Sequence, residues 1–307
     1  MSVPSALTHV LISKQTDFET AATPTKHVGL VVTSANAGGS AEVQESQGIG
    51  ALETTHVSDG LVTTNLSLEG EFQNGRLLEL VLGGVTHAQH ASTDDWTHTY
   101  SIEDSDYATV QIAYNLPTAF AENITGLTVN SATISTSLNE RVTLNVDFQG
   151  RTRVPGATVQ TAAKSTLPVF SQEDVTITMN SQTPSEIQDF EITFSKNPQS
   201  VGGLGSNIPQ QIHATELKVA FSGTLGFTDE EYHELFTDRT MHEIVFDAHN
   251  GVALGSGRRQ LYIKLEKCLL TEQSVAVSVG GINFVNLSGI GVVEEAYSVD
   301  DITSATW

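Results

Sequence analysis

The sequence predicts a mainly β protein made of two tandem β modules, each with one short α-helix. Three observations predict this fold class: apolar and polar residues alternate along many segments, only two segments look helical, and those two occupy matching places in the two halves. The clearest strand is 141–149, where even positions are apolar and odd positions polar, the period of a strand with one buried face. We therefore expect antiparallel sheets with one face on a core and one in water.

The other strands follow from the same alternation. In 66–72, for example, Leu66, Leu68 and Phe72 oppose Glu69 and Glu71. The further segments that predict strands are 28–33, 97–103, 108–114, 175–179, 190–194, 217–221, 261–265 and the valine run at Val275, Val277 and Val279.

Two short helices are predicted. Residues 76–82 are rich in leucine and are stopped by Gly83, which permits a left-handed C-terminal residue. In the second half Thr228 and Glu231 form a capping box, and apolar residues at helical spacing follow, which predicts a helix over 229–237.

The order of these elements indicates a weak internal duplication. Both halves begin with a strand and then have a long connection that contains a Gly-x-Gly sequence. A second strand, a helix and further strands follow in each half. We expect modules at 1–160 and 161–307, joined by a connector at 154–168 that contains Pro155 and Gly156.

The two long connections, 35–60 and 196–213, exceed the usual length of a loop in a compact domain. Because they recur at equivalent places, we expect them to contact neighbouring subunits, with Gly48, Gly50, Gly203 and Gly205 as candidate contact residues. The alternative is two mobile surface loops.

Composition excludes several classes of function. The chain has 307 residues and a formal charge of −22, so it lacks the cationic surface that binds nucleic acid or anionic lipid. No apolar stretch approaches the roughly 18 residues that span a bilayer, and the first residues do not resemble a secretory signal, so we expect no membrane anchor. Cys268 is the single cysteine and forms no internal disulfide. The acidity fits either a salt-loving host or an ordinary soluble surface.

No residues predict catalysis, a cofactor or a metal. Nucleophile-elbow, P-loop and dinucleotide motifs are missing, and Gly203–Gly205 and Gly289–Gly291 are interpreted as turns. A metal-ligand interpretation of His87, His90 and His98 near Asp94 and Asp95 is weaker than one of solvated histidines in a polar connection between strands. The pair Glu69 and Glu71 suits glycoside hydrolysis by type but is interpreted as solvated acid.

Three segments resemble the tail tube proteins of long-tailed viruses. The run 13–26 is similar to a K-E-x-x-y-G-T-a-x-x-P-T opening, with Glu19 in place of the usual glycine. Residues 60–72 followed by 77–83 look like the strand and helix pair of this family, and 130–135 running into 141–150 is similar to its long central hairpin.

The resemblance implies tail-tube-like β-sandwich or barrel modules, six to a ring, and rings stacked into a tail tube. A duplicated chain would form trimeric rings that imitate hexamers, with other tail proteins at the tube ends and no catalytic residues. The protein would be assembled in the host cytoplasm and located in the virion tail. With the acidity, the chain looks most like the tube protein of a haloarchaeal tailed virus.

The dimensions allow such a tube. Four strands per module give about 24 strands and a circumference of about 115 Å, which leaves a bore of roughly 27 Å, wide enough for double-stranded DNA in transit. A polar, acidic lining would repel phosphates and bind no DNA specifically. The candidate lining residues are Thr143, Asn145, Asp147, Gln149, Ser274 and Ser278. The alternative places these side chains on an outer solvated face.

Two other functions compete with a tube. A carbohydrate-binding or adhesin-like β protein of a virion would show clustered aromatic residues, but only 7% of residues are aromatic and Trp96 and Trp307 are far apart. A glycoside hydrolase would need a cleft around a carboxylate pair.

Overall fold

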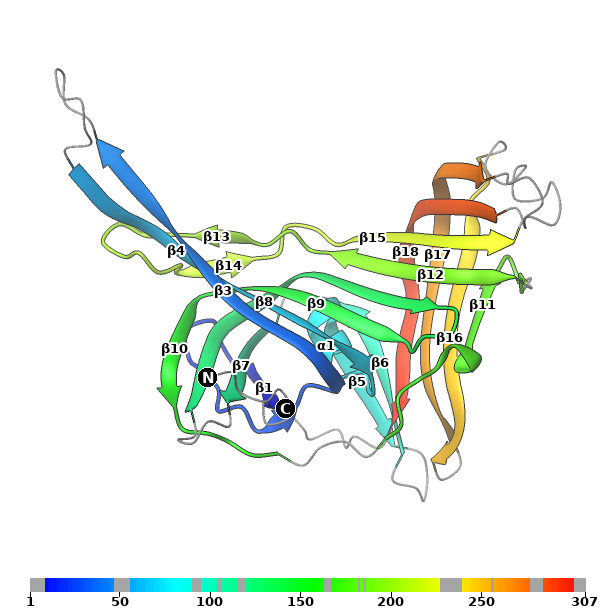
Figure 1. Ribbon diagram of the computed structural model, residues 1–307, viewed down its shortest axis with the longest axis horizontal. Coiled ribbons are helices and arrows are strands. Elements are labelled where there is room, and N and C mark those ends of the chain that lie inside the picture. Colours follow the sequence, from blue (N-terminus) through cyan, green and yellow to red (C-terminus); the bar gives the residue numbers. More distant parts are fainter. Residues whose placement is uncertain are drawn as a thin grey trace.

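A computed structural model gives the arrangement of the chain (Figure 1). It describes residues 9–46, 56–89, 95–103, 106–114, 120–162, 167–181, 183–184, 186–226, 239–254, 257–276 and 284–300. Over these residues the protein is mainly β, with one α-helix, α1 (Arg76–Leu82), and one 3₁₀ turn, η2 (Gln172–Asp174). The predicted fold class is confirmed.

The strands divide into two consecutive groups. The first group is β1 (His9–Gln15), β2 (Lys26–His27), β3 (Leu30–Ser46), β4 (His56–Phe72), β5 (Gly83–Gln89), β6 (Trp96–Ile102), β7 (Tyr107–Tyr114), β8 (Phe120–Ser137), β9 (Thr143–Gly150) and β10 (Thr152–Ala157). The second group is β11 (Val175–Met179), β12 (Ile187–Ser195), β13 (Gln199–Val201), β14 (Gln211–His213), β15 (Lys218–Gly226), β16 (His242–Leu254), β17 (Gly257–Ala276) and β18 (Phe284–Asp300).

Helix α1 has the predicted bounds, and its leucines are buried. Leu77, Leu78 and Leu80 are each at most 1% exposed. The helix ends where Gly83 adopts φ 102°, a left-handed conformation, and its N–H donates to the carbonyl of Glu79. The predicted helix over 229–237 lies outside the described residues.

The prediction of a long loop over 35–60 is wrong. Residues up to Ser46 belong to β3 and those from His56 to β4, and the two strands pair as a long hairpin that projects from the body (Figure 1). The small residues of this segment are typical of loops, yet Ala35 and Ala37 lie opposite Leu68 and Leu66 and extend the ladder. Gly48 and Gly50 lie outside the described residues.

Two further predictions need correction. The first part of the expected connector, 154–157, is strand β10, which pairs with β8 through a bulge near Pro155. The expected turn at Gly289–Gly291 is part of strand β18, where the missing side chain of Gly289 leaves space for the Phe221 ring. Glycine indicates close packing here and no change of chain direction.

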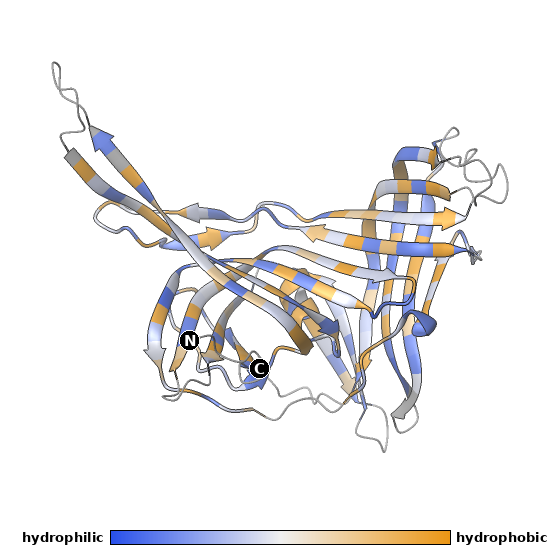
Figure 2. Cartoon of the chain, in the orientation of Figure 1, coloured by the Kyte–Doolittle hydropathy of each residue, from blue (hydrophilic) through white to orange (hydrophobic). Residues whose placement is uncertain are grey.

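A central sheet runs through both groups of strands. Its order is β3–β4–β9–β8–β12–β15–β18–β17, with every neighbouring pair antiparallel, four strands from each group. Alternation of hydropathy along these strands is visible in Figure 2. The apolar side packs against α1 and the flanking strands in one core that includes Leu68, Leu78, Val110, Phe190 and Phe246.

The flanking strands add to the two halves of this sheet in the same order. In the first group the order is β3–β4–β9–β8–β7–β1, and in the second it is β12–β15–β18–β17–β16–β11. Each series joins its elements in the same chain sequence. Among the described strands, β2, β5, β6 and β10 of the first group and β13 and β14 of the second stand outside this shared order. The two groups therefore share one topology.

The last strand returns to the first group. The end of β18 pairs with β6, and His98 Nε2 lies 2.9 Å from Asp300 Oδ1. His98 Nδ1 is also 2.7 Å from His87 Nδ1 on β5. The placement of these two residues in a loop is wrong, because both are on paired strands; His98 is buried, whereas His87 is exposed, as interpreted. His90 and Asp94 lie outside the described residues.

Candidate functional site

The side of the central sheet that faces away from the core is its candidate functional surface, which we call the polar face. Along each strand its residues alternate with buried ones, and the strand register places them opposite one another. They are Ser67, Glu69, Glu71, Thr143, Asn145, Asp147, Gln149, Ser131, Thr133, Ser135, Asp189, Glu191, Thr193, Lys218, Ser222, Thr224, Asn286, Ser288, Glu272 and Ser274.

The structure brings five of the six predicted lining residues onto this face. Thr143, Asn145, Asp147 and Gln149 lie at the centre of the first four strands, and the core residues between them are buried. Ser274 lies at the far end on β17, where Asn286 Nδ2 donates to its Oγ over 3.4 Å. Ser278 lies outside the described residues.

Sequence reasoning missed the contribution of β8 and β12. Residues 131–137 alternate hydroxyl side chains with Ala132, Ile134 and Thr136, all three buried. The same period-two signal that located β9 is present there, so the pattern could have added Ser131, Thr133 and Ser135 to the candidate list.

Hydroxyl groups hydrogen-bond across the strands of the polar face. Ser135 Oγ lies 2.7 Å from Thr143 Oγ1, and Ser131 Oγ donates to Asp147 Oδ2 over 3.1 Å. Thr133 and Thr193 join β8 to β12 by their Oγ1 atoms at 3.2 Å. Side chains held to each other are less available to bind a passing ligand.

The polar face is acidic. Its carboxylates are Glu69, Glu71, Asp147, Asp189, Glu191 and Glu272, whereas Lys218 is the one cation in the set defined above. Arg141 Nη1, at the edge of the face, lies 2.5 Å from Glu71 Oε2 and neutralises that carboxylate. Such a surface repels polyanions at low salt.

Both outer strands of the central sheet have an edge that is unpaired in the described residues. Strand β3 pairs with β4 alone, and the 269–276 part of β17 pairs with β18 alone. Thr271, Glu272, Ser274 and Val275 are exposed along the second edge. Exposed backbone N–H and C=O groups in such a row are a template for another strand.

The junction between the two groups of strands lies where β12 pairs with β8. The register runs from Asp189 opposite Ser137 to Ser195 opposite Ser131 without a bulge. On the core side Phe190, Ile192 and Phe194 lie opposite Thr136, Ile134 and Ala132. Strand β12 thus pairs with the edge of β8 beyond the part of β8 that pairs with β7.

The segment 196–213 follows β12 and contains the turn predicted at Gly203–Gly205. Ser206 N–H donates to the carbonyl of Gly203, and Leu204 at the tip is fully exposed. Strands β13 and β14 give the segment its own two-stranded sheet, and Asn207 accepts from Val62 N–H at 2.7 Å, so it lies against the β3–β4 hairpin (Figure 1).

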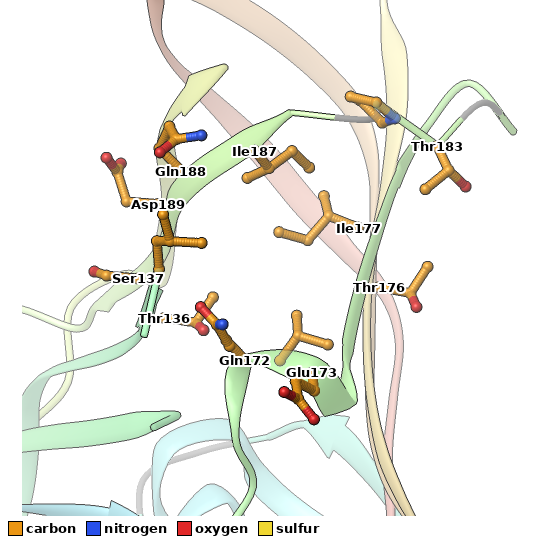
Figure 3. A pocket seen from close by; sticks show the side chains of 13 residues that line it. Thr136, Ser137, Gln172, Glu173, Thr176, Ile177, Thr183, Ile187, Gln188 and Asp189 are labelled. Carbon is orange, nitrogen blue, oxygen red and sulfur yellow. The ribbon is translucent and has the colours of Figure 1, made fainter. Parts of the chain in front are cut away.

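A small cavity of about 270 Å³ lies at the other end of β12, among β8, η2 and β11 (Figure 3). Its lining mixes Ile177 and Ile187 with hydroxyl and amide side chains, and Glu173 and Asp189 are its carboxylates. Among the described residues, no group of three His, Cys, Asp or Glu side chains is placed to hold a metal ion. The cavity supplies no nucleophile paired with a base.

The described part of the chain contains no helix long and apolar enough to cross a membrane. A comparison with curated proteins finds no match. A family model described as phage tail tube protein matches residues 5–254, most of the chain. This match agrees with the resemblance carried by 13–26, 60–83 and 130–150, and with a β-rich chain whose sheet has open edges. The chain belongs to the phage tail tube protein family.

Proposed function

We propose that three copies of this chain form a closed ring and that stacked rings form the tail tube of a virion, with a negatively charged bore for double-stranded DNA. The observation that carries the proposal is the central sheet, which has the same strand order in both groups and, in the described part of the chain, an unpaired edge at each end. The role is structural and includes no catalysis. Other tail proteins would join the tube at its ends.

The division into two duplicated modules, 1–160 and 161–307, is part of the proposal. It is supported by the shared strand order and by the equivalent strands β4 and β15. Leu66, Leu68 and Phe72 in β4 and Val219, Phe221 and Leu225 in β15 have the same spacing, and a glycine precedes the last apolar residue by two positions in both strands. The junction of β8 with β12 would then be a module-to-module contact made inside one chain.

Pairing between the open edges would close the ring. A strand edge left open on a soluble protein invites uncontrolled association, and a closed ring of identical head-to-tail contacts removes every such edge. Three chains that each contribute the eight strands of the central sheet supply about 24 strands, the number that gives a bore wide enough for duplex DNA.

The polar face would line this bore. Its other side is covered by α1 and the flanking strands, so a continuous sheet presents Thr143, Asn145, Asp147 and Gln149 to the lumen and the bulk of each module outward. Carboxylates there repel phosphate, and hydroxyls already bonded to each other offer few sites for the DNA backbone. The genome would pass without being held.

Contacts between rings would use the β3–β4 hairpin and the segment 196–213. Both lie side by side and project together from the body (Figure 1). Leu204, flanked by Gly203 and Gly205, is an exposed apolar side chain at the tip of a segment that carries no acidic residue over 197–212. A neutral tip can approach an acidic neighbour without charge repulsion.

The net charge of −22 supports a haloarchaeal tailed virus as the source, with assembly in the host cytoplasm, because molar salt screens the repulsion that a ring of three chains concentrates.

Microscopy of the purified full chain tests the function. Negative-stain images and mass measurement at low and at molar salt should show rings of three chains or hollow tubes. Monodisperse single chains under all conditions would count against the proposal, and a glycan array would then test the carbohydrate-binding alternative.

A further inference from the structure

We propose that β3 of one chain pairs with residues 269–276 of β17 in a second copy, in the register that β12 and β8 use within one chain. This inference rests on the proposed ring and specifies its contact residue by residue. One junction between modules is visible inside the chain. The strands of the equivalent junction, β3 and the 269–276 part of β17, are both present, and among the described residues neither pairs with another strand on that side. Within the chain, the Ala37 carbonyl of β3 accepts from Arg153 Nη1 over 3.2 Å.

The first half of the register follows from β4 and β15. Gly70 in β4 corresponds to Gly223 in β15, with Leu68 matching Phe221. The residues of β3 and β12 that lie opposite these positions therefore also correspond to each other. Phe190, Ile192 and Phe194 of β12 therefore match Val32, Ala35 and Ala37 of β3.

The second half follows from β9 and β18. Leu144 lies opposite Gly70 and Leu287 lies opposite Gly223, so these two leucines correspond. Ser135 pairs with Thr143, next to Leu144, and Ser274 pairs with Asn286, next to Leu287. Ser135 of β8 therefore matches Ser274 of β17.

Together the correspondences fix the contact between chains. Glu191 lies opposite Ser135 within the chain, and Glu191 matches Ser34, so Ser34 of one chain should lie opposite Ser274 of the next. The other opposed pairs are Val32 with Val275, Ala35 with Gln273, Asn36 with Glu272 and Ala37 with Leu270. Thr33 and Thr271 lie at bulges of β3 and β17 and oppose no residue, so this contact would contain two bulges that the β8–β12 junction lacks.

Side-chain sizes on the core face agree with this register. Within the chain the large Phe194 lies opposite the small Ala132, whereas between chains the small Ala37 would lie opposite the large Leu270. The exchange keeps the packed volume similar. Val275, now 40% exposed, would be covered by Val32.

Polar groups agree as well. Gln273 Nε2 is buried without a hydrogen-bond partner, and an arriving strand brings backbone carbonyls to that edge. Residues 30–41 of β3 carry no charged side chain in a chain of net charge −22, so Glu272 meets no like charge and faces the amide of Asn36. The geometry commits this edge to a second copy of the same chain.

Cysteine pairs test the register on the full chain under conditions where rings form. Oxidation of the double variant Ser34→Cys with Ser274→Cys should give covalent trimers on denaturing gels. The matched control Glu191→Cys with Ser135→Cys occupies the equivalent internal positions and should close within one chain, without any change in apparent mass. The buried Cys268 should react in neither variant.

Two shifted double variants test the register: Ser34→Cys with Glu272→Cys, and Asn36→Cys with Ser274→Cys. In both, the two sulfurs lie on the same face of the sheet but diagonally across the strands. They should therefore crosslink about fivefold less than Ser34→Cys with Ser274→Cys. Rings that form yet crosslink better through a shifted pair would overturn this register and leave the tube function standing. Absence of rings for the unmodified chain would overturn both.

Discussion

Thr133 on β8 and Thr193 on β12 lie directly opposite each other, with their Oγ1 atoms 3.2 Å apart, although 60 residues separate them in the chain. Beneath them, on the core side, Ile134 lies opposite Ile192. This pairing joins the two groups of strands into one sheet. Substitutions that weaken it should therefore lower the free energy of unfolding of the whole chain.

The change Ile192→Ala should destabilise the protein by about 3 kcal/mol, because both Ile192 and Ile134 are 1% exposed and truncation leaves a cavity between the two groups of strands. Urea unfolding followed by circular dichroism measures the loss. Val154→Ala on β10, where the valine is half exposed, is the control and should cost less than about 0.5 kcal/mol. Equal effects of the two changes would contradict a packed junction.

The change Gly83→Ala should cost about 1–2 kcal/mol, because an L-residue with a side chain is strained at φ 102°. Gly205→Ala provides a comparison, since that glycine also has a positive φ but lies in an exposed turn with open space around it. Thermal unfolding should show a loss of secondary structure at lower temperature for both. If Gly83→Ala leaves the midpoint unchanged, the left-handed end of α1 is not required.

The thiol of Cys268 should be inert in the folded protein. Burial raises its pKa to about 12, from an ordinary value of 9.0. A thiol reagent at pH 8 should therefore modify it only at the rate of unfolding, and urea should accelerate the reaction. Because the unfolded thiol ionises first, stability should fall as the pH rises from about 9 to about 12. Rapid labelling without denaturant would contradict this burial.

Salt should stabilise the chain. Raising KCl from about 0.1 M to about 3 M shortens the screening length from about 10 Å to roughly 2 Å and removes most of the self-repulsion of 36 acidic side chains. The unfolding midpoint should rise by about 5 °C or more in a thermal scan. The same midpoint at both concentrations would remove the halophilic origin from the proposal.

Reversing one charge on the polar face should make the tube retain DNA. Asp147→Lys would place a cation on the proposed bore surface in every chain, and filter binding at about 50 mM salt should detect duplex DNA that is released as salt rises. Glu173→Lys makes the same change of charge on η2, at the cavity beside the end of β12 and outside the set of polar-face residues, and is the control. Equal retention by both variants would place Asp147 outside the bore.

Much of the local structure was predictable from the sequence because it depends on residues close in the chain. The alternation in 141–149 located β9, the leucines and Gly83 gave the bounds of α1, and 175–179 coincides with β11. In each case, the spacing of apolar residues along the segment indicates which side chains are buried.

Other features depended on partners distant in the chain. The sequence from Ala35 to Ser40 predicts a loop because its small side chains have weak strand propensity. Pairing with β4 nevertheless makes this segment a strand. The sequence alone gives no sign that His98 is buried, because its partner Asp300 on β18 comes from 202 residues away. The open edges of the described strands, on which the proposed contact between chains rests, become visible only when the order of the strands is known.

The return of β18 to the first group also bears on the timing of synthesis. The 269–276 edge of β17 needs β18 as its neighbour, and β18 is the last strand of the described chain. In the proposed ring, a nascent chain that has not yet made β18 would therefore offer its companions no finished acceptor, which would delay polymerisation until that strand has been translated. This order of synthesis would protect a cell that makes many copies at once from aggregation of incomplete chains.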